Sequence, residues 1–349
     1  MACRRLVGPE GGLQNVIHTF GVFVYNSAMR KIPANLLTLY ADLLQRAEAG
    51  GPRPGSISSK TVRGRKFLYA VEREGHVRTQ RYLGPANNAS AQAAAEDARR
   101  AQSDAVERRA TVRALKNASI PAPPAQTGRI LHAVESAGLF RSGLVLIGTA
   151  AYRLYPAALG YYLSSSAIMT QDADFSVAAF AGGEVVDFEA ILQKADPSFK
   201  ARMANTDKAP HAFKSADGFM VELLTKHVRN RTTPVPVPAL TASAEALSFQ
   251  EYLTEDTMTI VALHGAGVPV RVPAPLRYGI HKLIVAQQRA KTNPKRRKDL
   301  IQAKELLAVM REIDPEGYGD EMAAARKRGQ KWRKMIDASL QEIASSAPA

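Results

Sequence analysis

Cysteine is nearly absent from this sequence of 349 residues, which contains Cys3 and no other. A disulfide framework and a cysteine-based zinc site are therefore excluded. This composition is typical of a protein from a reducing compartment. The basic residues near the start are followed by no apolar segment of the signal-peptide kind, so we expect a cytoplasmic protein.

Long apolar runs are missing as well. No stretch approaches the ~20 residues that a membrane-spanning helix needs, so we expect no membrane partner. The sequence also lacks a Gly-x-Ser-x-Gly elbow, a Walker phosphate loop and a dinucleotide fingerprint, which excludes the enzyme classes built on them. Its 7 histidines are dispersed without metal-ligand spacing.

Acidic residues are few relative to basic ones. The chain has 47 Lys and Arg against 32 Asp and Glu, for a formal net charge of +15. Such an excess favours a polyanionic partner, which could be RNA, DNA or the phosphates of a nucleotide. Many basic proteins bind no nucleic acid, so the charge alone identifies no partner. The 46% hydrophobic and 23% charged residues are ordinary for a globular chain that is long enough for two or three cores.

The most informative stretch runs over residues 143–176. Its apolar residues 144–147 predict a buried strand, and Gly148-Thr149 then turns the chain into a helix. Further on, Asp172 and Asp174 share one face of a predicted strand, because strand side chains alternate. Two neighbouring carboxylates repel each other unless a divalent cation lies between them, and such oxygen ligands suit Mg²⁺.

Gly148 and Thr149 supply the complementary feature. A glycine turn at the start of a helix exposes backbone N–H groups that can hold a phosphate. Together with the two aspartates, this turn indicates chemistry on a nucleoside triphosphate. The simpler alternative is a glycine turn beside a solvated Asp-x-Asp.

A third acid lies on a predicted hairpin over residues 211–224. Asp217-Gly218 is a strong turn dipeptide, and Glu222 follows in an otherwise apolar strand. A bare charge there is costly without a partner. A metal shared with Asp172 and Asp174 would provide that partner. Asp217 is explained as a turn residue and is not counted among the site acids.

These residues carry a resemblance to a known family. Gly148-Thr149 with its helix, Asp172-x-Asp174 and the later strand acid look like the signature of the nucleotidyltransferase fold of polymerase-beta-like enzymes. The segments GTAAY, TQDADFS and DGFMVELLT resemble bacterial members similar in kind to the nucleotidyltransferases of abortive-infection and toxin–antitoxin systems. The likeness covers roughly residues 126–310. Two departures are the long insert between Gly148 and Asp172 and a threonine where serine is commoner.

The resemblance implies an α/β (α+β) protein in which a mixed sheet forms a nucleotidyltransferase fold. It implies transfer of a nucleoside monophosphate from an NTP to an acceptor, with Mg²⁺ or Mn²⁺ as cofactor. Asp172 and Asp174 would hold two ions, with Glu222 completing the catalytic one, while Gly148 and Thr149 cradle the terminal phosphates. The acceptor stays open between tRNA or other RNA, protein and a small molecule. The alternative is a non-catalytic nucleic-acid-binding or regulatory protein that retains the fold.

Three regions are predicted. Residues 1–120 form a separate N-terminal α+β unit, residues 126–275 the catalytic domain and residues 276–349 a C-terminal helical region, with a proline-rich linker at residues 121–124. Two candidate strands, residues 246–253 and a hairpin over residues 258–272, should join the catalytic sheet, and a helix should cover residues 185–192. In the helical region, Lys282 and Lys298 are candidates for phosphate or acceptor contacts, and a solvated basic face is the alternative.

The N-terminal unit contains three recognisable segments. Apolar residues at helical spacing predict a helix that ends near residue 50, and a Gly/Pro/Ser-rich break follows at residues 50–59. A basic hairpin is predicted over residues 66–84, followed by a long exposed helix over residues 89–116. Basic residues interleaved with Tyr69 and Tyr82 could contact a nucleic-acid backbone. The alternative is an edge hairpin protected by its charges.

Overall fold

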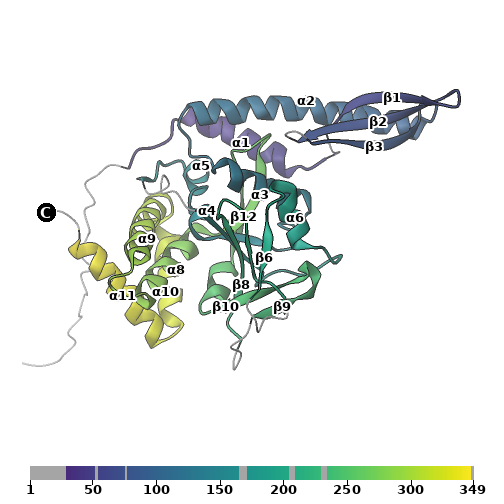
Figure 1. Ribbon diagram of the computed structural model, residues 1–349. Helices are drawn as coiled ribbons and strands as arrows, with labels where there is room; N and C mark the ends of the chain where they lie inside the picture. The colour runs from purple at the N-terminus through teal and green to yellow at the C-terminus, as the bar shows by residue number, and fades with distance from the viewer. Residues whose placement is uncertain are drawn as a thin grey trace, which may run out of the picture.

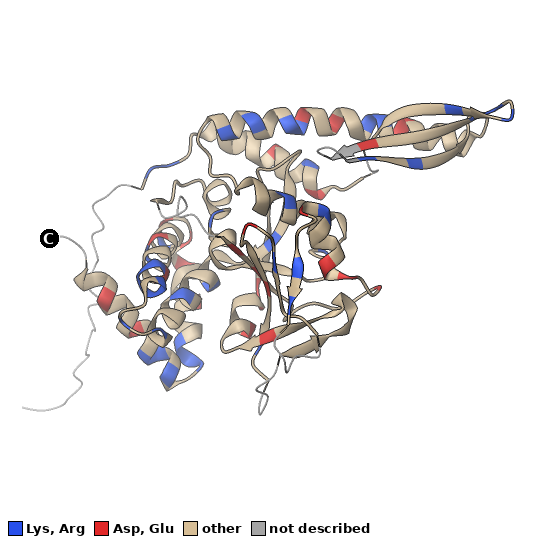
Figure 2. Cartoon of the chain, viewed as in Figure 1, with Lys and Arg blue, Asp and Glu red and all other residues tan. Residues whose placement is uncertain are grey.

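A three-stranded antiparallel sheet and a long helix form an arm at one end of the protein (Figure 1). The computed structural model describes residues 29–51, 54–74, 77–164, 171–203, 209–228 and 234–346. The sequence also has an apolar run at residues 16–24, which lies outside the described residues. Figure 2 shows acidic residues interspersed with basic ones along the helix of the arm. The N-terminal elements are α1 (Ala34–Glu48), β1 (Ser56–Val62), β2 (Arg65–Glu74), β3 (Val77–Pro85) and α2 (Ala89–Asn117).

Local chemistry explains the boundaries of the arm. Arg63 and Gly64 both have positive φ, 47° and 76°, which suits the two-residue turn between β1 and β2. The side chain of Asn88 accepts a hydrogen bond from the Ser90 N–H at 2.8 Å and caps α2. The hairpin and the long helix are confirmed. The break predicted at residues 50–59 was wrong for its last four residues. Strand β1 already begins at Ser56, and it pairs with β2 although its sequence shows little apolar alternation.

The first helix and the end of α2 pack into the main body of the protein. Tyr40, Leu43 and Leu115 are buried in the same hydrophobic cluster as strand β4. The Tyr40 hydroxyl also accepts a hydrogen bond from the Val261 N–H at 3.0 Å. The domain limits at residues 120 and 275 stay predictions, and this shared core ties part of the first region to the second.

The central sheet has seven strands with the path β4-β5-β8-β10-β9, and β6 and β7 attach through β8. Strand β5 runs antiparallel to β4 and parallel to β8, and β8 runs parallel to β10. The prediction of one mixed sheet that contains the apolar strand and both acidic strands is confirmed. The strands are β4 (Val145–Ile147), β5 (Asp172–Ser176), β6 (Lys200–Arg202), β7 (Ala212–Lys214), β8 (Met220–Lys226), β9 (Val235–Val237) and β10 (Ala242–Leu247).

One face of the central sheet is apolar and the other carries the acids. Phe175 and Val221 are fully buried, and the Phe175 ring lies 6.3 Å from that of Phe188 in α6 (Phe188–Ala195). Helix α6 and the C-terminal helices lie on opposite sides of this sheet (Figure 1). The predicted helix from residue 185 begins three residues later, because the side chain of Asp187 accepts a hydrogen bond from the Ala190 N–H at 3.1 Å and caps it.

Two strand predictions after the central sheet were wrong. The hairpin of β11 (Thr257–Ala262) and β12 (Val268–Pro273) forms a separate two-stranded sheet, although β12 lies beside β4. Residues 246–253 comprise the end of β10, a turn and the short helix α7 (Gln250–Thr254). Both segments are apolar, and burial alone does not distinguish a strand of one sheet from a strand or helix packed against it.

The C-terminal region is helical, as predicted, and has its own hydrophobic cluster that includes Ile284, Ala303 and Ile336. Proline stands in the first turn of three of its helices, where the missing N–H costs nothing. No helix among the described residues is long and apolar enough to cross a membrane. The remaining helices are α3 (Ala125–Ser136), α4 (Gly148–Tyr152), α5 (Tyr155–Leu159), α8 (Pro275–Gln288), α9 (Pro294–Ile313), α10 (Pro315–Lys327) and α11 (Gln330–Ser345), with a 3₁₀ turn at Pro238–Leu240.

Candidate active site

Three neighbouring strands place the predicted acids in one region. Strand register sets Asp174 of β5 opposite Glu222 of β8, and Ile147 of β4 opposite Asp174 from the other side. Asp172 precedes Asp174 by two residues and therefore lies on the same face. This face is directed toward α8 and α9, since Lys282 and Lys295 from those helices act electrostatically on Asp174. The sheet thus brings together three carboxylates that span 50 positions of the sequence, from Asp172 to Glu222.

Gly148 is fixed directly beside Asp174. Its φ is +67°, and a Cβ added there would lie 2.4 Å from the Asp174 Oδ2 atom. No side chain could occupy this position without displacing the carboxylate. The hydroxyl of Tyr278 donates a hydrogen bond to the Gly148 carbonyl oxygen at 2.8 Å. Helix α8 therefore holds the glycine turn against β5.

Asp174 has an unusual electrostatic environment. Burial, followed by the negative charges of Asp172 and Glu222, raises its pKa to about 7. Lys282 and Lys295 act in the opposite direction without cancelling this rise. At neutral pH, Asp174 therefore lies near the midpoint of its titration, and a cation beside it would favour the ionised form.

The acids fit a magnesium ion by donor chemistry. Their oxygens are hard ligands, and Mg²⁺ usually binds one or two carboxylates together with water and substrate phosphates. In the part of the chain that the structure describes, no three acidic, histidine or cysteine side chains are gathered so that they could hold a metal ion. A site in which Asp172, Asp174 and Glu222 all contact one ion therefore stays a prediction.

Thr149 and Gly148 stand at the start of α4, as predicted. This helix has five residues, so its dipole is short. Thr149 is 7% exposed, which leaves little of its surface accessible to a ligand. The predicted phosphate contacts of this turn thus depend mainly on its backbone.

The two predicted lysines occupy different environments. Lys282 is buried and donates to the Asp299 Oδ1 atom at 2.7 Å, while Arg289 donates to Oδ2 of the same aspartate at 2.7 Å. Burial alone would raise the pKa of Asp299, but these two cations hold it below its ordinary value. Lys298 is half-buried, and burial and the nearby Lys282 lower its pKa, whereas Asp172 acts to raise it. Both lysines therefore interact electrostatically with a site acid, Lys282 with Asp174 and Lys298 with Asp172, and Lys282 is also ion-paired with Asp299.

Sequence reasoning missed three residues of this site, namely Tyr278, Lys295 and Asp299. Tyr278 was hidden because its role depends on a hydrogen bond to a residue 130 positions away. Asp299 had a weak signal, since it is an acid that directly follows the basic run of residues 295–298.

Asp217 lies in the turn between β7 and β8, as predicted. It accepts hydrogen bonds from the Gln126 side chain at 3.1 Å and from the Phe219 N–H at 3.4 Å. Its bonds with Ser215 and Gln126 lower its pKa. These contacts stabilise the turn, which explains this acid without a catalytic role.

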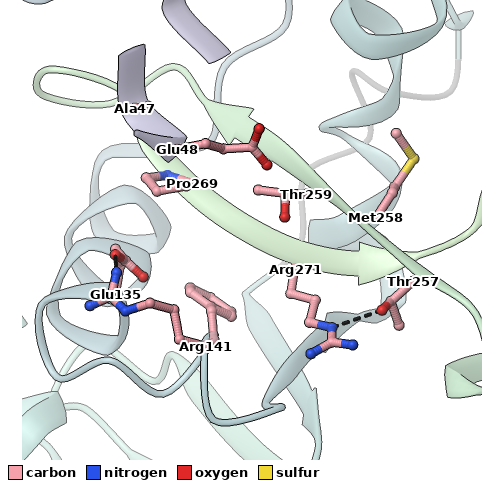
Figure 3. A pocket seen from close by; sticks show the side chains of 10 residues that line it. Ala47, Glu48, Glu135, Arg141, Thr257, Met258, Thr259, Pro269 and Arg271 are labelled. Carbon is pink, nitrogen blue, oxygen red and sulfur yellow. Dashed lines mark hydrogen bonds and ion pairs between the residues drawn. The ribbon is translucent and has the colours of Figure 1, made fainter. Parts of the chain in front are cut away.

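A cavity of about 330 Å³ lies elsewhere (Figure 3), between the end of α1, α3 and the β11–β12 hairpin. Its volume is within the range of small-molecule sites. Arg141 donates to Glu135 at 2.5 Å, and Arg271 donates to the Thr257 hydroxyl at 2.7 Å. None of the three site acids lines this cavity, so the acids and this cavity are separate features.

Comparison with known proteins finds a matching family over the central sheet and much of the helical region. Residues 125–327 match a protein family described as "Nucleotidyltransferase". No curated protein matches this sequence. The crystal structure of an antigenic nucleotidyltransferase-like protein from Paracoccidioides brasiliensis is similar at 13% sequence identity, with a TM-score of 0.31, over 61% of this chain and 92% of that chain. At this score, that likeness assigns no residue roles.

Proposed function

Because this chain belongs to a nucleotidyltransferase family, we propose that it transfers a nucleoside monophosphate from an NTP to an acceptor with Mg²⁺, or Mn²⁺, as cofactor. The observation that carries this proposal is the pairing of Asp174 with Glu222 on adjacent strands, with Asp172 on the same face and Gly148, directly after β4, beside Asp174. In a protein without catalytic activity, three neighbouring carboxylates that repel one another and help to raise the pKa of Asp174 would have no role. All three acids belong to residues 125–327, which match the family. They lie on one sheet face beside the glycine turn at Gly148.

In the reaction, an acceptor hydroxyl forms a new P–O bond to the α-phosphorus of the NTP. The bond between that phosphorus and the bridging oxygen breaks, pyrophosphate leaves and the hydroxyl proton passes to solvent. When bound, Mg²⁺ supplies charge neutralisation of the phosphates and activation of the attacking oxygen. The roles of Asp172 and Asp174 are to bind the metal, with Glu222 directed to the same face to complete the catalytic position. Asp174 must lose its proton for this role.

The basic side chains of α9 serve the phosphates in this proposal. Lys298 interacts with Asp172, and Lys295 acts on Asp174 and is exposed. Both cations lie on the side of the sheet from which the triphosphate would approach. Lys282 is paired with Asp299, which positions α9 against α8, and its contact with phosphate stays a prediction. The backbone of Gly148 and Thr149 would hold the terminal phosphates.

The acceptor remains RNA, tRNA included, protein or a small molecule, and a place in abortive-infection or toxin–antitoxin systems stays a prediction. The test is incubation of the purified protein with Mg²⁺, each α-labelled NTP in turn, and total RNA or total protein. Label should enter one acceptor fraction with one preferred NTP, and it should disappear when the metal is chelated.

Two matched variants make this test specific to the proposed acids. Glu222→Gln should lower transfer by about 10²-fold or more, since a lost metal ligand costs several kcal/mol of transition-state stabilisation. Asp217→Asn, in the turn of the same hairpin, should leave transfer nearly unchanged. An active Glu222→Gln variant with an inactive Asp217→Asn variant would show that the wrong acid was chosen.

A further inference from the structure

The outer face of the arm sheet carries aromatic and basic side chains. Register places Lys60 of β1 opposite Phe67 of β2, and Tyr69 of β2 opposite Tyr82 of β3. The Tyr82 ring centre lies 5.5 Å from that of Tyr69 and 6.1 Å from that of Phe67. Tyr82 is 55% exposed. These three rings form a continuous aromatic patch on one face of a three-stranded sheet.

Helix α2 covers the opposite face of this sheet. Ala70 is fully buried there, and the Gly55 N–H donates to the Ala98 carbonyl of α2 at 3.3 Å. Gly84 approaches Ala91 of α2 so closely that an added Cβ would lie 2.9 Å from the alanine Cβ. The small residues of the helix therefore allow close packing, and the sheet needs no aromatic residue for its contact with α2. The aromatic patch has no such explanation.

The charge of the outer face has one sign. Lys60 donates to the Gln80 side chain at 2.6 Å, and its Nζ lies 5.1 Å from the Tyr69 ring centre. Arg65 and Arg78 are exposed on the same face by strand alternation. The acid Glu72 belongs to the other face, where it lies 3.6 Å from Arg81. Figure 2 shows basic residues along these strands and at the outer tip of the sheet.

We propose that this face, made of Lys60, Arg65, Phe67, Tyr69, Arg78 and Tyr82, binds single-stranded nucleic acid. Exposed rings on a sheet offer stacking surfaces to unpaired bases, and the surrounding cations offer contacts to phosphates. A second copy of this chain fits the face poorly, because self-association would bring like charges together. A paired duplex keeps its bases stacked on one another, so it would leave the aromatic patch unused.

The nucleic-acid site is physically separate from the acids of the central sheet. The sheet packs against the first part of α2, through Ala91 and Ala98, whereas Leu115 near the end of α2 lies in the main core. The 29 residues of α2 span about 43 Å. The arm therefore captures nucleic acid at a distance from the catalytic face, and this inference does not rest on the proposed transfer reaction.

The test is fluorescence anisotropy of labelled oligo(U) and oligo(dT) of about 15 nucleotides, a typical site size, without NTP or Mg²⁺. A duplex of equal length and inorganic polyphosphate serve as competitors. The single strands should bind best, with affinity that falls linearly on a log–log plot against salt. Binding should be the same for the Asp172→Asn variant, so failure of the transfer reaction does not affect the outcome.

Matched variants separate stacking from charge. Tyr82→Ala should weaken binding about 5-fold or more, and Tyr82→Phe should retain most of it, because the ring is the stacking surface. Val106→Ala, which removes a similarly exposed apolar side chain from α2, should change nothing. Lys60→Ala should reduce the salt slope by about 0.7, while Lys66→Ala on the opposite face should not. Three outcomes would each overturn the proposal. The first is that polyphosphate competes as well as the single strands while Tyr82→Ala has no effect. The others are a preference for duplex and an absence of binding at low salt.

Discussion

Replacing Asp174 by asparagine should stabilise the protein at alkaline pH while abolishing the proposed transfer. The substitution is nearly isosteric and removes the charge that burial and two neighbouring carboxylates disfavour. The pKa of Asp174 rises from 3.8 to about 7 on folding, which corresponds to about 4 kcal/mol against the ionised form. This value is an upper limit, since a partly exposed carboxylate keeps some contact with water.

The sign of the pH dependence follows from proton linkage. Between about pH 4 and pH 7, the folded state binds a proton at Asp174 that the unfolded state has released, so this group makes wild-type stability fall as pH rises. The advantage of Asp174→Asn should therefore be small near pH 4, increase through pH 7 and remain constant above it. Each kcal/mol should raise Tm by about 2 °C.

The measurement is thermal unfolding of both proteins at several pH values with a chelator present. Asp217→Asn is the control, because hydrogen bonds lower the pKa of this exposed turn acid and its removal should give no stabilisation at any pH. Addition of Mg²⁺ should raise the Tm of the wild type more than that of Asp174→Asn. A variant less stable than the wild type at pH 8, or a difference independent of pH, would refute the electrostatic argument for this site.

Three further substitutions test the supports of the site. Gly148→Ala should cost more stability than Gly265→Ala. Both glycines have positive φ, but an added Cβ meets a carboxylate only at Gly148. Equal stability losses of the two variants in denaturant unfolding would exclude a clash between this Cβ and Asp174. Asp299→Asn should destabilise by about 3–5 kcal/mol, because it leaves two buried or half-buried cations without their partner, and a loss below 1 kcal/mol would contradict this. Tyr278→Phe should cost about 1 kcal/mol for its lost hydrogen bond and lower transfer activity; unchanged activity would show that the glycine turn needs no such support.

Local patterns in the sequence determined the elements that carry the site. Alternation along residues 172–176 places Asp172 and Asp174 on one strand face, and the structure has them on the partly exposed face of β5. The Asp217-Gly218 dipeptide predicts the turn that sends Glu222 into β8, and this turn is confirmed. These predictions succeed because strand alternation and turn conformation depend on residues that are close in the chain.

Only the tertiary structure decided which elements meet. Nothing local distinguishes the β11–β12 hairpin, which forms its own sheet, from a pair of strands in the central sheet. The pairing of Lys282 with Asp299 likewise appears only when α8 packs against α9. The register that sets Asp174 opposite Glu222 depends on contacts between residues far apart in the chain. Such contacts are fixed by the packing of buried surfaces, which no short sequence pattern encodes.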